Sequence, residues 1–142
     1  FFFFFHTLTQ EQMDDLKSSY EIEKVVYASD ELRKVCANIP ARATMFDIRQ
    51  IASSLVDEAR EKGCKFMSVM GEPCLITCVY HQLVSDFEQS IIDEFQKGSS
   101  KLDVHFLQST TERQSVDEVQ PDGSVKKIAI FRHVMWREWL FV

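Results

Sequence analysis

The chain has 142 residues, of which 45% are hydrophobic and 27% are charged, and its formal net charge is −6. This length matches one ordinary domain that can bury a hydrophobic core without cross-links. The composition excludes a collagen-like, coiled-coil or disordered chain. Acidic and basic residues are mixed and no basic run exceeds two residues, so we expect a mildly acidic protein that does not bind nucleic acid directly.

The first five residues are all Phe. This run lacks the basic region and the cleavage site of a signal peptide. No stretch of the chain approaches the roughly 18 apolar residues of a membrane-spanning helix, so we expect no membrane partner. Residues 1–8 are predicted to be an N-terminal tail whose Phe run lies outside the fold, and residues 9–142 are predicted to be a single α+β domain.

The next segments are predicted to be helical. Thr9 and Gln12 have the spacing of a capping box and predict a short helix over about 10–18. The apolar residues of 22–39 fit one helix, or a short strand followed by a second helix that Ser29 caps. Both alternatives end before the proline that follows, because proline disrupts a continuing helix.

The clearest helix signal begins at Thr44, which forms a capping box with Asp47. An amphipathic stripe follows it, with apolar residues at helical spacing from Ile48 to Ala59. Gly63 comes directly after this stripe, where a glycine commonly ends a helix in the left-handed conformation. The sequence therefore predicts a helix that runs from this capping box to that glycine.

Two short apolar segments, 64–70 and 75–80, flank a Gly-Glu-Pro turn and predict a β-hairpin. A second interpretation makes residues 73–97 one long helix, because apolar residues keep helical spacing throughout this range. Ser85 and Glu88 have capping-box spacing in the middle of that range. We therefore prefer a strand followed by a helix, although the sequence leaves both interpretations open.

The last third of the chain is predicted to be β-structure. Residues 102–108 form one strand, and residues 112–119 and 125–134 form a hairpin around a Gln-Pro-Asp-Gly turn. Three cross-strand pairs support this register, two of them between opposite charges: Val119–Val125, Glu118–Lys126 and Asp117–Lys127. The predicted fold class is therefore α+β, with two or three N-terminal helices followed by ββαβββ and helices packed on one face of an antiparallel sheet.

Four cysteines are present, and an apolar core removes the need for disulfides, so we expect a reducing, cytoplasmic environment. Cys74, Cys78 and His81 are spaced to ligate a metal if they lie on a helix. On the preferred strand, however, the two cysteines are too far apart to share one ion. We expect no metal and no cofactor. A Cys/His-dependent enzyme, with His105 or His133 as the base, is the third functional hypothesis.

A small-molecule or nucleotide sensor is the second functional hypothesis, with the ligand held between sheet and helices. Its predicted polar contacts are Arg113, His105, His133 and Tyr80, since a binding site needs a few convergent polar groups on an apolar wall. Arg113 stands in a hydroxyl-rich segment, 109–115, that suits an anion. This segment is equally typical of a solvated connection between strands.

The C-terminal nine residues are unusually apolar for a chain end. They complete the core of this domain, or they contact a partner through Trp136, Trp139, Phe141 and Met135. Because the familiar catalytic signatures are absent, the first hypothesis is a non-enzymatic association module that forms a homo-oligomer or a subunit of a larger assembly.

Overall fold

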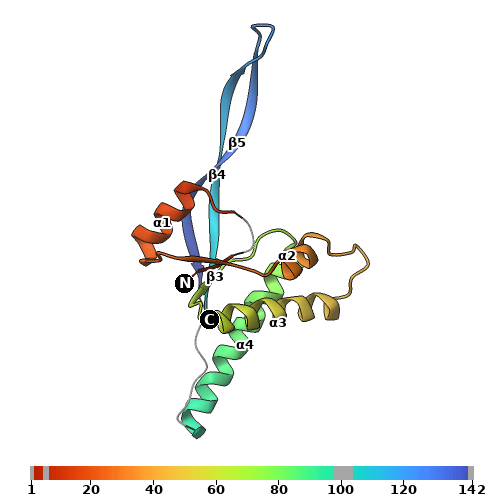
Figure 1. Cartoon of the computed structure of the whole chain (residues 1–142), viewed down its shortest axis with the longest axis vertical. Coiled ribbons are helices and arrows are strands. Elements are labelled where there is room, and N and C mark those ends of the chain that lie inside the picture. Colours follow the sequence, from red (N-terminus) through yellow and green to blue (C-terminus); the bar gives the residue numbers. More distant parts are fainter. Residues whose placement is uncertain (1, 5–6, 98–103, 141–142) are drawn as a thin grey trace.

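The computed structural model describes residues 2–4, 7–97 and 104–140. The elements in chain order are β1 (Phe2–Phe4), α1 (Gln10–Tyr20), β2 (Val25–Tyr27), α2 (Asp30–Ala37), α3 (Met45–Glu61), β3 (Phe66–Met67), α4 (Pro73–Lys97), β4 (His105–Val119) and β5 (Val125–Trp139). Helices and strands thus alternate through most of the chain (Figure 1). The expected mixture of α and β structure is confirmed, but the expected ββαβββ order is wrong.

The strands form one sheet in the order β2-β1-β3-β4-β5. Strands β1, β2, β3 and β4 pair in parallel, and only β5 runs antiparallel, beside β4. The expectation of a purely antiparallel sheet is therefore wrong. From β1 the chain crosses to β2 on one side, and then returns past β1 to β3 and β4 on the other side. The sheet consequently has a topological switch point between β1 and β3.

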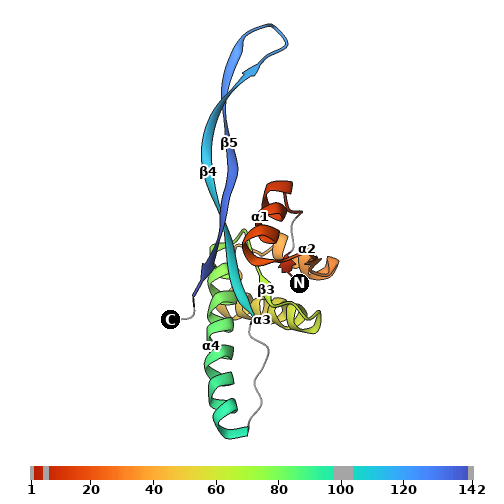
Figure 2. The same ribbon diagram turned by 90° about the vertical axis from the view of Figure 1, so that its left-hand side faces the viewer.

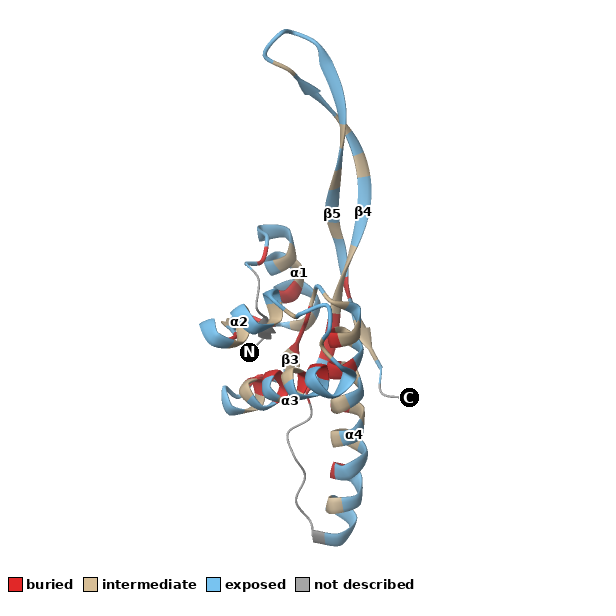
Figure 3. Cartoon of the chain, turned by 90° about the vertical axis from the view of Figure 1, so that its right-hand side faces the viewer, coloured by how far each residue is buried: buried red, intermediate tan, exposed pale blue. Residues whose placement is uncertain are grey.

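Helices cover both faces of this sheet, which corrects the expectation that they pack on one face. One core cluster joins the sheet to α3 and α4 and includes Leu55, Val79 and Phe106. The other joins the sheet to α1 and includes Leu16, Leu107 and Trp136. Neighbouring residues of β4 enter different clusters because successive side chains of a strand point to opposite faces. Figure 3 shows buried residues concentrated where the helices meet the sheet.

Within the Phe run, Phe2–Phe4 form strand β1, although the run was expected to lie outside the fold. Phe2–Phe4 pairs with β2 along one edge and with β3 along the other. An interior parallel strand has a neighbour on each edge, and helices cover both faces of its sheet. The sequence of such a strand is a continuous apolar run and does not alternate between apolar and polar residues. A homopolymeric Phe sequence suits this position in the sheet.

The first three helices begin as their capping residues predict. Thr9 and Thr44 each form a complete capping box, at the starts of α1 and α3. The alternative with a short strand before Ser29 is confirmed, because Val25–Tyr27 is β2 and Ser29 caps α2. Gly63 follows the C-cap of α3 with a φ of 71°.

Residues 73–97 form the single helix α4, so the preferred strand and its hairpin with 64–70 are wrong. Glu72 starts the helix, because its carboxylate accepts a hydrogen bond from the Leu75 N–H at 2.7 Å. Pro73 stands at the first helical position, which needs no N–H donor. The Ser85 capping signal lies inside this helix, where the apolar spacing on both sides of it continues without a break.

Strands β4 and β5 form a hairpin of 15 residues a strand. The predicted pairs of Val119 with Val125, Glu118 with Lys126 and Asp117 with Lys127 are all present. The predicted break between residues 108 and 112 is absent, so one long strand replaces two. Figure 2 shows that this hairpin extends far beyond the other elements, while α4 extends in the opposite direction. None of the described helices is both long enough and apolar enough to cross a membrane.

Candidate functional site

The candidate site lies at the carboxyl edge of the parallel strands, where α1 meets the base of the β4–β5 hairpin. The Thr9 capping box holds the Gln12 side chain in place, since Gln12 Oε1 accepts a hydrogen bond from the Thr9 N–H at 3.0 Å. The Gln12 amide nitrogen then donates to Ser109 Oγ of β4 at 3.2 Å. A local helix-start signal thereby fixes a contact between residues 97 positions apart in the chain.

An irregularity in β5 places His133 against α1. Thr110 pairs with Met135 and Thr111 pairs with His133, so Val134 is an extra residue in the ladder. Such a β-bulge reverses the alternation of the following side chains. His133 consequently shares a face with Trp136, three residues away, and their rings lie 5.4 Å apart. Without the bulge the imidazole would point to the opposite face of the hairpin.

His133 connects a serine to an aspartate. Its Nδ1 lies 2.7 Å from Ser109 Oγ, and its Nε2 lies 2.8 Å from Asp15 Oδ2 of α1. The same Asp15 oxygen accepts the Trp136 backbone N–H at 3.0 Å, and Ser19 donates to the other oxygen at 2.6 Å. The His133 side chain is only 5% exposed. These groups form a continuous hydrogen-bonded network between α1 and the hairpin.

The network determines the ionisation state of Asp15. Burial alone would raise the pKa of this carboxyl, but the hydrogen bonds from Ser19, His133 and the Trp136 N–H outweigh burial and lower the pKa below its ordinary value. Asp15 is therefore a carboxylate at neutral pH. A carboxylate at Nε2 favours the tautomer with its proton on that nitrogen, which leaves Nδ1 to accept the Ser109 hydroxyl proton.

A hollow of about 370 Å³ opens beside this network, between the start of α1 and the hairpin. Gln12 and His133 of the network line it. Its other walls include the Phe131 ring, the Thr111 hydroxyl and the Arg132 guanidinium. Arg132 donates to Glu11 at 2.7 Å, so its charge is balanced by a neighbouring carboxylate. The hollow thus offers one aromatic plane and several polar groups within a small volume.

A buried hydroxyl lies near the switch point of the sheet. Ser68 directly follows β3 and is 0% exposed, and its Oγ has no hydrogen-bond partner in the described part of the chain. Phe66 and Met70 pack in the core cluster on the α1 face, whereas Met67 and Val69 pack in the other cluster. By alternation Ser68 belongs to the α1 face. Buried polar groups are nearly always paired, so this hydroxyl needs an explanation.

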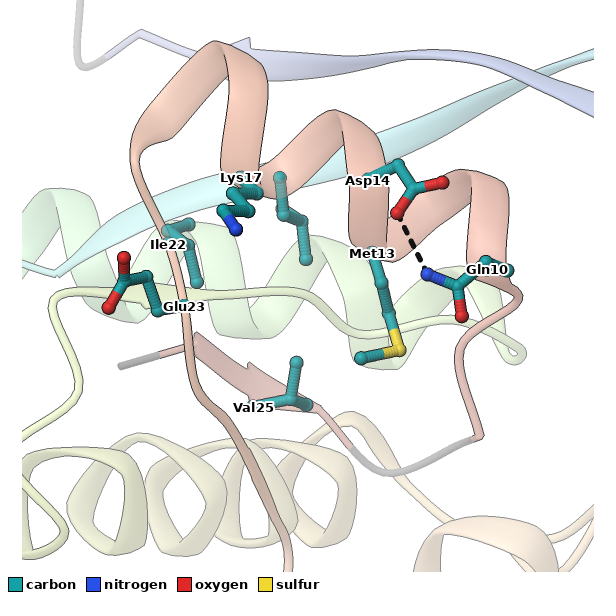
Figure 4. A pocket seen from close by; sticks show the side chains of 8 residues that line it. Gln10, Met13, Asp14, Lys17, Ile22, Glu23 and Val25 are labelled. Atoms are coloured by element: carbon teal, nitrogen blue, oxygen red, sulfur yellow. Dashed lines mark hydrogen bonds between the residues drawn. The ribbon is translucent and has the colours of Figure 1, made fainter.

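A larger hollow, of about 450 Å³, lies on the other side of α1, against β2 (Figure 4). Met13 and Val25 line it, and Gln10 is bonded to Asp14 at 2.8 Å. Its charged lining consists of two acidic side chains, Asp14 and Glu23, and one lysine, a combination that is common on helix surfaces. It lies away from the Ser109–His133–Asp15 network, so we place the candidate site at the smaller hollow.

The four residues predicted to contact a ligand are not brought together. His133 lines the candidate site, whereas Arg113 is exposed and does not line it, although it pairs with Phe131 in the site's wall. His105 Nδ1 lies 2.6 Å from Glu138 Oε1 near the other end of β4. Tyr80 belongs to α4, and its hydroxyl donates to the Leu140 carbonyl at 2.6 Å, after the end of β5. The predicted set therefore does not form one site.

The C-terminal aromatic segment contributes mainly to the core. Trp136 is 2% exposed and its indole N–H donates to the Gln12 carbonyl at 3.0 Å, so its ring is not available to a partner. Trp139 is half-buried, with its ring 5.1 Å from that of Tyr80. Met135 is 47% exposed, and Phe141 lies outside the described residues. Of the predicted interface residues in the described part, only Met135 is exposed.

The cysteines provide little support for thiol chemistry. All four are free, and no cluster of three metal-ligating side chains occurs among the described residues, although Cys74, Cys78 and His81 share α4. Burial raises the pKa of the Cys36 thiol to about 11 and also raises the pKa of Cys64. These two thiols stay protonated at neutral pH and are weak nucleophiles.

Sequence reasoning missed the partners of His133. Gln12 was recognised as a capping residue and Ser109 as part of a hydroxyl-rich segment, but neither role indicates a contact across the fold. Asp15 had only its spacing to Ser19 as a signal, which is common on helix surfaces. The bulge that aligns His133 with them leaves no mark in the sequence, because Val134 fits a regular strand equally well.

Comparison with known proteins assigns the chain to a family. No curated protein and no solved structure matches it. Residues 1–137, which include the Phe run of β1, α1 and nearly all of the hairpin, match the family described as Uncharacterized protein MJ1673 family. The match covers far more than half of the sequence, and the chain therefore belongs to the MJ1673 family.

Proposed function

We propose that this protein is a nucleotide-binding sensor domain whose ligand occupies the hollow between the start of α1 and the base of the β4–β5 hairpin. The observation that carries the proposal is the strand order 2-1-3-4-5 with parallel strands β1 to β4. In open α/β sheets, ligands bind outside the carboxyl ends of the strands near the switch point, and this strand order is one that binds mononucleotides there. This support is an analogy at the level of the fold.

The side chains around the hollow support a nucleotide in particular. The Phe131 ring is 67% exposed and offers a plane on which a base can stack. The Thr111 hydroxyl and the second amide hydrogen of Gln12 offer hydrogen bonds to the base edge or sugar, and the Arg132 guanidinium suits a phosphate oxygen.

Titration with nucleoside monophosphates, followed by NMR of the ¹⁵N-labelled protein, tests the proposal. We expect shifts at residues 9–12 and 131–133. Phe131→Ala should weaken binding by about tenfold or more, since stacking of one base contributes ~1–3 kcal/mol. The control is Val119→Ala, which also removes an exposed apolar side chain from the hairpin but lies near its tip, and it should leave affinity unchanged.

Two results would contradict the proposal. The first is the absence of any saturable shift across the four common bases. The second is a set of shifts that cluster around Val119 at the tip of the hairpin or around the hollow beneath α1 at Met13 and Val25, with no change at residues 131–133. The Phe131 ring lies outside both core clusters, so Phe131→Ala should not change the melting temperature. If the melting temperature is indeed unchanged, a loss of affinity in this variant reflects the binding site and not the fold.

A further inference from the structure

Beyond its base, where Arg132 is bonded to Glu11 of α1, the β4–β5 hairpin stands away from the rest of the protein. We call residues 112–132 the arm; the chain enters and leaves it next to the Thr111–His133 pair (Figures 1 and 2). No residue of the arm belongs to either core cluster. A two-stranded ribbon that is alone in water is marginally stable at best. The length of this arm therefore suggests that another surface covers one of its faces.

The two faces of the arm differ in composition. The regular ladder from Thr111 to Val119 assigns alternate pairs to each face. One face, which we call the isoleucine face, carries four pairs: Glu112–Arg132, Gln114–Ile130, Val116–Ile128 and Glu118–Lys126. Its four central residues are half-buried, whereas the residues of the opposite face are all exposed. The apolar centre of the isoleucine face marks it as the side to be covered.

Charges on the isoleucine face follow a strict arrangement. Both acidic residues, Glu112 and Glu118, lie on β4, and both basic residues, Arg132 and Lys126, lie on β5. They stand at the two ends of the apolar centre. This face is therefore complementary to a copy of itself in one orientation, in which β4 of each arm lies over β5 of the other.

We propose that the isoleucine face is a homodimer interface, in which the arms of two copies pack face to face and point in the same direction. A two-fold axis parallel to the arms sets Glu118 over Lys126 of the second copy, and Val116 over Ile128 of the second copy. Such a contact is isologous and closed, as most soluble dimer interfaces are. The base of this face borders α1, where Arg132 is bonded to Glu11, so the arms meet over the pairs from Gln114–Ile130 outward.

The charges also select this orientation against its alternative. If the two arms pointed in opposite directions, β4 would lie over β4 and Glu118 would approach Glu112 of the second copy. Like charges in such proximity oppose association. A different protein would need its own matching order of acid, apolar and basic residues, whereas a second copy supplies that order by symmetry.

Native mass spectrometry and sedimentation at micromolar concentration test the interface. The natural chain should be a dimer. The double variant Ile128→Thr, Ile130→Thr should weaken the dimer by at least about tenfold, because it removes buried apolar area while it keeps β-branched residues in the strand. The control Ala129→Thr changes the opposite face and should dimerise normally. A monomeric natural chain, or a dimer that survives the double variant, overturns the proposal.

Charge exchange tests the orientation. Glu118→Lys alone and Lys126→Glu alone should each be mainly monomeric, since each places like charges across the interface. A mixture of these two variants should form heterodimers. The double exchange Glu118→Lys, Lys126→Glu restores opposite charges both within and between arms and should dimerise like the natural chain. If all four samples associate equally, or if the mixture stays monomeric while the double exchange dimerises, the parallel arrangement is wrong.

Discussion

At the scale of single residues, Asp15 is the group on which the contact between α1 and the hairpin depends. It accepts hydrogen bonds from His133, Ser19 and the Trp136 backbone. Hydrogen bonds to a charged group contribute more to stability than neutral ones, and a partner left unpaired in a buried site adds a further cost. The carboxylate thus links the first helix to the last strand more firmly than its position on a helix surface indicates.

Asp15→Asn should lower the free energy of unfolding at pH 7 by roughly 2 kcal/mol, since it replaces a charged acceptor in a mostly buried network. Urea denaturation measures this change. The matched control is Asp14→Asn, which alters an exposed neighbour bonded to Gln10 and should change the free energy by less than about 0.5 kcal/mol. Equal effects of the two substitutions would contradict the role given to Asp15.

The pH dependence of stability should also change in Asp15→Asn. The folded-state pKa of Asp15 lies below its ordinary value, so its contribution is present above the unfolded-state pKa and is lost as pH falls through the folded-state pKa. The natural protein should therefore lose more free energy of unfolding than the variant between neutral pH and strongly acidic pH. Parallel stability curves for the two proteins over this range would contradict the assignment.

At the scale of elements, the turn that joins β3 to α4 contains a glycine with an unusual backbone angle, a buried hydroxyl and the start of a helix. Gly71 has a φ of 110°, a value that other residues rarely adopt, although a Cβ at this position would meet no other atom within 4 Å. Ser68 and Glu72 lie on either side of it, the first buried without a partner and the second bonded to the start of α4. The backbone at this carboxyl edge thus depends on one glycine.

Gly71→Ala should destabilise the protein by about 1 kcal/mol or more, because the backbone angle is unfavourable for a residue with a Cβ. Thermal or urea unfolding measures the effect. Gly63→Asn is the comparison: its φ of 71° lies in the region that asparagine adopts readily, so its cost should be clearly smaller. If Gly71→Ala and Gly63→Asn lower the free energy of unfolding by the same amount, the assignment of strain to Gly71 is wrong.

The elements that sequence reasoning predicted well are those that carry their own local signals. The capping boxes at Thr9 and Thr44, the cap at Ser29 and the hairpin register at Glu118–Lys126 depend on residues a few positions apart. Strand β1 was missed because it is only three residues long and uniformly apolar. No periodicity distinguishes such a segment from helix or tail. Strand β3 lies within the strand predicted over 64–70, but it pairs with β1 and β4 instead of forming the predicted hairpin.

The candidate site was less predictable than the fold because its parts come from three distant elements. His133 was identified as a polar candidate, but its alignment with Asp15 depends on the bulge at Val134 and on the packing of α1. Tertiary contacts of this kind produce no characteristic spacing in the sequence. The sequence shows which residues have suitable chemistry, but it does not show that these residues lie together in the fold.

At the scale of the whole molecule, the protein consists of a three-layer body and an arm that is separate from it. The body is held by two core clusters, one on each face of the sheet. The arm contributes to neither, so body and arm should be separable by mutation. This separation allows ligand binding and association to be tested independently of each other.

Replacement of residues 115–129 by an Asn-Gly turn that joins Gln114 to Ile130 should leave the body folded, because these two residues are already paired. The free energy of unfolding of the monomer should change by less than about 1 kcal/mol, and nucleotide affinity should stay the same. Circular dichroism with urea and the NMR titration measure these properties. Loss of the folded body in this variant would show that the arm is part of the core after all.

The contact of Trp136 with α1 also has a consequence for the order in which the chain folds. During synthesis, the ribosome releases β1, α1 and α4 before it adds Leu107 and Trp136, which complete the cluster beneath α1. The α3–α4 side can form its own cluster at an earlier stage, apart from Val104 and Phe106. The apolar face of α1 therefore stays uncovered until almost the last residues emerge, and this helix is where a nascent chain would most need protection from aggregation.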